Sequence, residues 1–143
     1  MLFSRPKAKR ISTTFYQKQS KFLDLIAKIE AQISEVDCPF YVLDVAKVSS
    51  NYARFFTALT SQYKAAKIAY SYKTNYMPFL CKTYHSLGAW AEVVSMMEYE
   101  MAVKNGVNPA QILYNGPAKK AAEMERALRN QSVVHIDHSK EWA

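Results

Sequence analysis

The sequence predicts an α/β fold, namely the first half of a (β/α)8 barrel that is apparently truncated after its fourth strand. Short strand-like runs alternate with helix-like segments at intervals of roughly 20–25 residues, which is typical of βα units around a parallel sheet. Gly88 and Gly106 each follow a helix-like segment, where glycine usually forms the left-handed cap. The sequence stops at Ala143, one turn into a further helix-like segment, so we expect a truncated domain.

Two helices and a short β-rich run are expected before this alternation begins. Residues 16–34 show the pattern of an amphipathic helix, and Asp37–Pro39 ends it. Residues 40–43 are β-rich, and Asp44 is suited to cap a second helix. The apolar stripe of that second helix consists of Val48, Tyr52, Phe55, Phe56 and Leu59.

Four strands and their connecting helices follow. The strands are predicted near residues 68–72, 91–95, 111–115 and 133–137, and the helices over residues 78–87, 97–105 and 119–130. Parallel strands need such crossovers, which are right-handed. The alternation alone fits both an open doubly wound sheet and part of a barrel, which usually has about 250 residues. The incomplete helix from Ser139 onward favours the barrel.

Composition restricts the class of protein. The chain has 143 residues, of which 50% are hydrophobic and 22% charged, which suits one globular domain and excludes a disordered chain. The net charge of +7 arises mainly in residues 1–21, which hold six basic residues and no acidic one. A nucleic-acid-binding protein carries its basic residues on the folded body. We therefore expect a basic tail over residues 1–21, a folded domain over residues 22–143 and no nucleic-acid partner.

The leader and the two cysteines bear on localisation. A basic leader without acidic residues is also typical of organelle transit peptides, but Pro6 and the dense Lys/Arg run disfavour the amphipathic helix of such peptides. The sequence has no run of about 18 apolar residues, so we expect no membrane partner. Cys38 and Cys81 give neither a disulfide framework nor the spacing of a metal site. We expect a cytoplasmic protein without a metal.

Lys73 is the main candidate for chemistry. It follows the predicted strand 68–72 at its carboxyl end, where βα barrels carry their active sites. Strand alternation places Ala69, Ser71 and Lys73 on one face, so that only small side chains lie beside the amine. Such an amine can form a Schiff base, the link by which enzymes hold pyridoxal phosphate. On this pattern alone, a surface lysine at a strand end is the simpler interpretation.

Five sequence motifs in order extend this interpretation. They are P-F-Y-V-L-D at 39–44, K-I-A-Y-S-Y-K-T-N at 67–75, A-E-V-V-S-M-M-E-Y-E at 91–100, I-L-Y-N-G-P-A-K at 112–119 and V-V-H-I-D at 133–137. In this order and spacing, the chain from about Cys38 to its end resembles the amino-terminal part of the alanine-racemase-fold (fold type III) pyridoxal phosphate-dependent decarboxylases. This family includes the diaminopimelate, ornithine and arginine decarboxylases.

The resemblance assigns roles to three residues. Lys73 matches the lysine of the family motif Y-A-x-K-x-N, which implies a catalytic and cofactor-binding role. Ser71 stands in place of the alanine and keeps that position small, and we expect it beside the cofactor. Glu92 matches the aspartate of D-V-V-S-x-x-E with one methylene more, and we expect it to bind the cofactor as well.

The resemblance also implies the function of the whole protein. It implies a lyase that uses pyridoxal phosphate to decarboxylate a basic or diamino acid. Diaminopimelate is the first candidate substrate and ornithine the second. The full-length protein is expected to be a homodimer. Met96 and Met97 stand where diaminopimelate enzymes often have two glycines, which weakens the choice of substrate. The alternatives are a non-catalytic pyridoxal phosphate-binding protein and an amino-acid racemase of the same fold. We expect the 143-residue chain alone to be inactive, because the remaining family motifs fall beyond Ala143.

The remaining motifs receive structural interpretations. Asn115–Lys119 is expected to be a strand-to-helix turn with Pro117 in the first helical turn. His135 and His138 flank Asp137 without a third cluster of metal ligands, so we expect no metal there. Cys81 has the spacing of a core residue.

Overall fold

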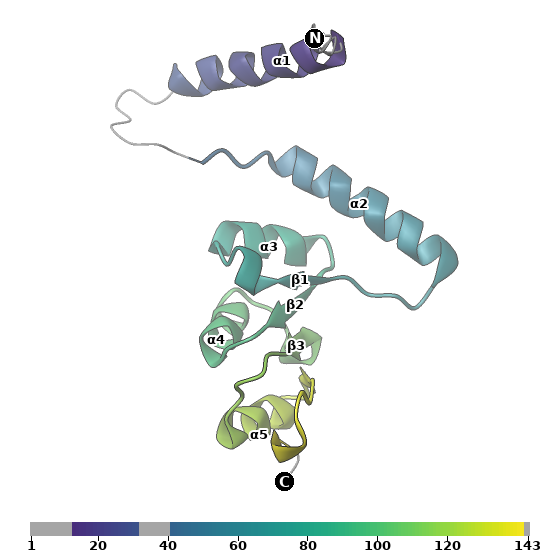
Figure 1. Ribbon diagram of the computed structural model, residues 1–143, viewed down its shortest axis with the longest axis vertical. Helices are drawn as coiled ribbons and strands as arrows, with labels where there is room; N and C mark the ends of the chain where they lie inside the picture. The colour runs from purple at the N-terminus through teal and green to yellow at the C-terminus, as the bar shows by residue number, and fades with distance from the viewer. Residues whose placement is uncertain (1–12, 32–40, 142–143) are drawn as a thin grey trace, which may run out of the picture. The chain divides into compact units, whose positions relative to one another are not determined.

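The computed structural model describes residues 13–31 and 41–141, which belong to two compact units divided after Val42 (Figure 1). The described part of the first unit contains one helix, α1, Thr13–Glu30. Its predicted range was 16–34, of which residues 32–34 lie outside the described residues. The helix begins three residues earlier than expected, so the end of the predicted basic tail is helical from Thr13 onward. In the described residues, no helix is long and apolar enough to cross a membrane.

The second unit is a parallel sheet with connecting helices. Its elements are α2 (Val45–Gln62), β1 (Ala69–Ser71), the 3-10 helix η1 (Tyr72–Thr74), α3 (Pro78–Ser86), β2 (Trp90–Val93), α4 (Met96–Lys104), η2 (Pro109–Gln111), β3 (Ile112–Tyr114), α5 (Ala121–Arg129), β4 (Val133–Val134) and η3 (Ser139–Glu141). The four strands are parallel in the order β1-β2-β3-β4. Right-handed crossovers between strands in sequential order put the three crossover helices, α3, α4 and α5, on the same face. The fold is therefore of the singly wound barrel type, and the doubly wound alternative is excluded.

The buried core lies between this sheet and helices α3, α4 and α5. Neighbouring strands align Tyr70 with Ala91 and Ile112, and Val93 with Tyr114. Ala91, Val93, Ile112 and Tyr114 are fully buried on the helix side. The residues of opposite parity, such as Glu92 and its partner Leu113, are only partly buried. In a complete barrel this second face lines the interior.

Local signals explain where the helices begin and end. Asp44 caps α2 by accepting a hydrogen bond from the Lys47 backbone N–H at 2.8 Å, as predicted. Ser95 caps α4 through the Glu98 backbone N–H at 3.3 Å. Pro78 occupies the first turn of α3. Gly88 and Gly106 have φ angles of +95° and +90°, as the predicted left-handed caps require.

The predicted apolar stripe of α2 is only partly covered. Only Tyr52 is buried, where its ring packs edge-on against Tyr84 of α3 at 6.2 Å. Phe55 remains 60% exposed and Phe56 37% exposed. Val48 and Leu59 are half-buried, so the exposed part of the stripe is Phe55 and Phe56, in the middle of the helix.

Several predicted elements are shorter than expected. Residues 41–43 of the β-rich run form no strand, and residue 40 lies outside the described residues. The strand after residue 68 ends at Ser71, because Tyr72 already begins a 3-10 turn. Helix α5 begins at Ala121, so Pro117 lies in the preceding turn and not in the first helical turn. The side chain of Glu123 defines this start by accepting the Lys120 backbone N–H at 3.3 Å.

Candidate active site

The predicted site residues lie near one edge of the sheet. Lys73 belongs to η1 directly after β1, and Asn115 follows β3. Ser71 and Glu92 are aligned partners on β1 and β2. Since all four strands are parallel, their carboxyl ends meet at this edge, where βα barrels carry their active sites.

The turn that carries Lys73 is held by hydrogen bonds on both sides. Thr74 Oγ1 donates to the Ser71 carbonyl at 2.7 Å, and the Tyr70 hydroxyl donates to the Asn75 carbonyl at 2.9 Å. The Asn75 side chain accepts the Met77 backbone N–H at 3.0 Å. Lys73 itself is exposed, and its amine forms no hydrogen bond or ion pair with any residue that the structure describes. The turn therefore presents a free amine on a fixed backbone.

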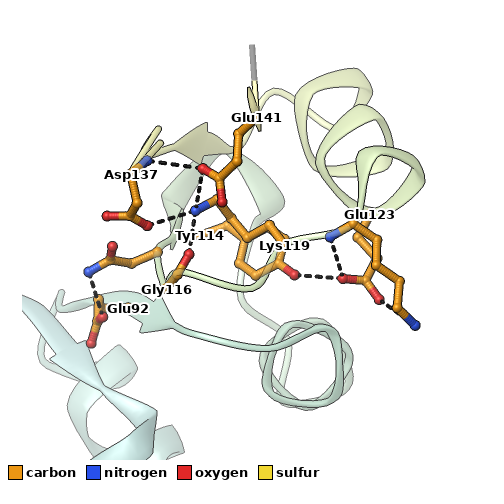
Figure 2. Close-up of polar contacts among 9 residues, drawn as sticks. Glu92, Tyr114, Gly116, Lys119, Glu123, Asp137 and Glu141 are labelled. Carbon is orange, nitrogen blue, oxygen red and sulfur yellow. Dashed lines mark hydrogen bonds and ion pairs between the residues drawn. The ribbon is translucent and has the colours of Figure 1, made fainter. Parts of the chain in front are cut away.

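Ser71 and Glu92 are polar residues at the carboxyl ends of β1 and β2. The Ser71 hydroxyl is buried and has no hydrogen-bond partner among the described residues. Glu92 accepts a hydrogen bond from the Asn115 side-chain amide at 3.3 Å, which links the ends of β2 and β3 (Figure 2). An unpartnered buried hydroxyl costs about 1–3 kcal/mol, so a ligand that supplies a partner gains from binding there.

The turn between β3 and α5 is joined to the segment after β4 by Lys119, whose amine is fully buried (Figure 2). The amine donates to the Gly116 carbonyl and lies 2.8 Å from Asp137 Oδ2 and 3.0 Å from Glu141 Oε2. Burial by itself lowers the pKa of Lys119, but the hydrogen bonds and charges of the two carboxylates outweigh it and raise the pKa. The Asp137 backbone N–H and the Lys119 amine both bind Glu141 and lower its pKa. This network was not predicted, because the two carboxylates lie 18 and 22 residues after Lys119 in the sequence.

The other sequence motifs form loop and core structure and contain no metal site among the described residues. Asn115–Lys119 forms a turn, as predicted. His135 and His138 are exposed, and Asp137 pairs with Lys119. Within residues 13–31 and 41–141, no group of three or more His, Cys, Asp or Glu side chains could hold a metal ion. Cys81 is fully buried in the core, as predicted, whereas Cys38 lies outside the described residues.

We expect Gly116→Ala to destabilise the domain by about 1–3 kcal/mol. Gly116 has a φ angle of +97°, and an added Cβ would lie 2.9 Å from the Val94 carbonyl oxygen. Gly106→Ala is the matched control, because Gly106 has a φ angle of +90° but no atom within 4 Å of the added Cβ. Urea denaturation measures both variants. Equal losses of unfolding free energy would show that the close approach to Val94 contributes nothing.

Comparison with known proteins shows which family this chain resembles. A family model described as "Pyridoxal-dependent decarboxylase, pyridoxal binding domain" matches residues 45–143. The chain is 33% identical over 104 residues to diaminopimelate decarboxylase of Aquifex aeolicus, covering 72% of this chain and 24% of the relative. It is 27% identical over 103 residues to the Methanothermobacter thermautotrophicus enzyme of the same name, again covering 72% of this chain and 24% of the relative. The chain thus spans about a quarter of the length of these curated relatives.

Solved structures show the same fold. The structure of a point mutant of Helicobacter pylori diaminopimelate decarboxylase complexed with L-lysine superposes with a TM-score of 0.69 at 24% identity, covering 79% of this chain and 28% of that one. Lysine/ornithine decarboxylase from Vibrio vulnificus, complexed with putrescine, gives a TM-score of 0.68 at 24% identity, covering 82% of this chain and 32% of that one. The fold of three βα units and a fourth strand is therefore shared with part of the barrel-containing decarboxylases.

Proposed function

Because this chain belongs to the pyridoxal-binding domain family of the pyridoxal-dependent decarboxylases, we propose that the whole protein is a pyridoxal phosphate-dependent lyase that decarboxylates a basic or diamino acid. The observation that supports this most directly is Lys73, a free amine on a hydrogen-bonded turn at the carboxyl ends of the strands. Diaminopimelate is the first candidate substrate, since it is the substrate named for the relatives. Ornithine or a related diamino acid is the second.

The chemistry of the residues at this edge fits the cofactor. Bound through a lysine amine, pyridoxal phosphate supplies an electron sink for the bond that is broken. We propose that Lys73 holds the cofactor covalently. The unpartnered Ser71 hydroxyl supplies a hydrogen-bond donor and acceptor beside it. Glu92, oriented by Asn115, supplies a carboxylate that binds or orients the cofactor.

The two methionines after β2 lie at the start of α4. Met96 and Met97 form the first turn of α4, where Ser95 caps the helix. Met96 packs against the core, and Met97 is 56% exposed. A regular helix start needs no glycine. The methionines thus fit the start of a regular helix, and their departure from the two-glycine pattern still weakens the choice of diaminopimelate, which the assay below tests.

The proposal includes the organisation of the whole protein. We propose a cytoplasmic homodimer, with a basic tail over residues 1–21 and the amino-terminal part of the barrel domain over residues 22–143. The family match from residue 45 onward supports the second part of this division. The 143-residue chain alone is expected to be inactive, because it spans only about a quarter of its relatives.

The decisive experiment is an assay of CO2 release by the full-length protein. Diaminopimelate, ornithine, lysine and arginine are supplied in turn with pyridoxal phosphate, and alanine serves as the control. We expect CO2 from diaminopimelate and none from alanine. Racemisation of alanine without CO2 would assign the protein to the racemases. Cofactor binding with neither reaction would identify a non-catalytic pyridoxal phosphate-binding protein and contradict the proposal.

A further inference from the structure

Tyr72 is the residue directly before Lys73. Its side chain is fully buried in the core, whereas the Lys73 side chain is exposed. The Tyr72 hydroxyl lies 2.8 Å from Nε2 of His85 in α3. The other ring nitrogen of His85, Nδ1, lies 2.8 Å from the Ala89 carbonyl oxygen, just before β2. Two hydrogen bonds thus run from the turn of Lys73 through the end of α3 to the start of the neighbouring strand.

The chemistry of the partners determines the direction of both hydrogen bonds. A carbonyl oxygen only accepts, so Nδ1 of His85 carries the proton and donates to Ala89. Burial lowers the pKa of His85, which keeps the ring neutral near pH 7. Nε2 is then an acceptor, and the Tyr72 hydroxyl donates to it. Burial also raises the pKa of Tyr72, which keeps this donor protonated.

The placement of this pair links it to Lys73. Tyr72 and Lys73 are consecutive residues of a 3-10 helix only three residues long, so a movement of the Tyr72 side chain displaces the Lys73 backbone. An apolar side chain at position 72 would fill the same core without a buried polar partner, and a buried polar pair is favourable only with fixed geometry. The pair therefore provides orientation that packing alone does not.

We propose that Tyr72 and His85 are positioning residues that hold the Lys73 amine in the orientation needed for its covalent bond to pyridoxal phosphate. This inference rests on the proposed function, because it gives the pair a role toward the cofactor lysine. Neither side chain reaches the cofactor itself, since both lie on the helix side of the turn.

The test is competitive labelling of the full-length protein with limiting pyridoxal 5′-phosphate, followed by borohydride reduction and peptide mapping. The readout is the labelling of Lys73 relative to Lys82, an exposed lysine on α3. Both lysines are in the same molecule, so a general loss of stability affects them together. Tyr72→Phe and His85→Leu are expected to lower this ratio about fivefold, the effect of one hydrogen bond. His85→Gln keeps a side-chain acceptor for Tyr72 and is expected to restore most of the ratio.

The outcomes separate this inference from the proposed function. If the wild type prefers Lys73 and Tyr72→Phe has the same ratio of Lys73 to Lys82 labelling as the wild type, the positioning role is overturned and the proposed function stands. If His85→Gln behaves as His85→Leu, packing rather than hydrogen bonding controls Lys73, which also overturns the inference. If Lys73 is not preferred in the wild type, the proposed function fails and the positioning role fails with it. Tyr72→Phe removes one oxygen atom, so it decides the question even if His85→Leu does not fold.

Discussion

Lys73→Arg is expected to abolish covalent capture of pyridoxal phosphate at this position in the full-length protein. Arginine keeps the positive charge but its guanidinium does not form the imine that a primary amine forms. In the wild type, borohydride reduction and peptide mapping should place a phosphopyridoxyl group on Lys73. In Lys73→Arg, labelling of that peptide and the absorbance of the bound cofactor should both fall to background.

Lys67→Ala is the matched control for this experiment. Lys67 is exposed and precedes β1, at the amino end of the strand and away from the edge that carries Lys73. Its replacement should leave labelling unchanged. Labelling of another lysine in place of Lys73 in the yellow full-length protein, or full labelling of that peptide in Lys73→Arg, would refute the assignment of Lys73.

Lys119→Met is expected to lower the free energy of unfolding by about 1–3 kcal/mol, because it removes charge-assisted hydrogen bonds from a buried amine but leaves carboxylates that solvent can reach. Methionine retains the length of the side chain, so the loss reports the amine and not a cavity. Without the amine, Asp137 and Glu141 lie close together without their shared cation, and the Gly116 carbonyl loses a donor. The turn after β3 then loses its link to the segment after β4. Urea denaturation at pH 7 measures this effect.

Lys120→Met provides the control at the neighbouring position. The Lys120 side chain is 83% exposed and lies 3.9 Å from Glu123, so its replacement should cost about 0–1 kcal/mol. If the two variants lose similar stability, the buried network contributes no more than a surface pair.

The pH dependence of the same network gives an independent check. The pKa of Glu141 is lowered in the folded protein from its usual value of 4.5, so its stabilising contribution is present above pH 4.5 and is lost as the pH falls through the folded pKa. The pKa of Lys119 is raised from 10.5, so its contribution is present below pH 10.5 and is lost at higher pH. The difference between wild type and Lys119→Met should be constant from pH 6 to 9 and smaller below pH 4. A difference independent of pH down to pH 3 would contradict the ion-pair explanation.

Local features of the sequence were sufficient to predict the alternation of strands and helices. Gly88 and Gly106 mark helix ends because only glycine readily adopts a positive φ, which depends on the residue itself. The cap at Asp44 likewise depends on a hydrogen bond to a residue three positions away. The position of Lys73 after the first strand followed from the same short-range pattern. Such features depend on residues only a few positions apart, so they can be predicted from the sequence.

Only the tertiary structure decided which of these segments meet. The strand order that excludes a doubly wound sheet, the exposure of Phe55 on α2 and the pairing of Tyr72 with His85 all depend on how separate elements pack. Lys119 shows the reason most clearly. Its partners are 18 and 22 residues away, on the far side of α5, and they meet it only because β3 and β4 are adjacent and parallel. A contact of this kind is a property of strand register and helix length together, and no local pattern of residues encodes it.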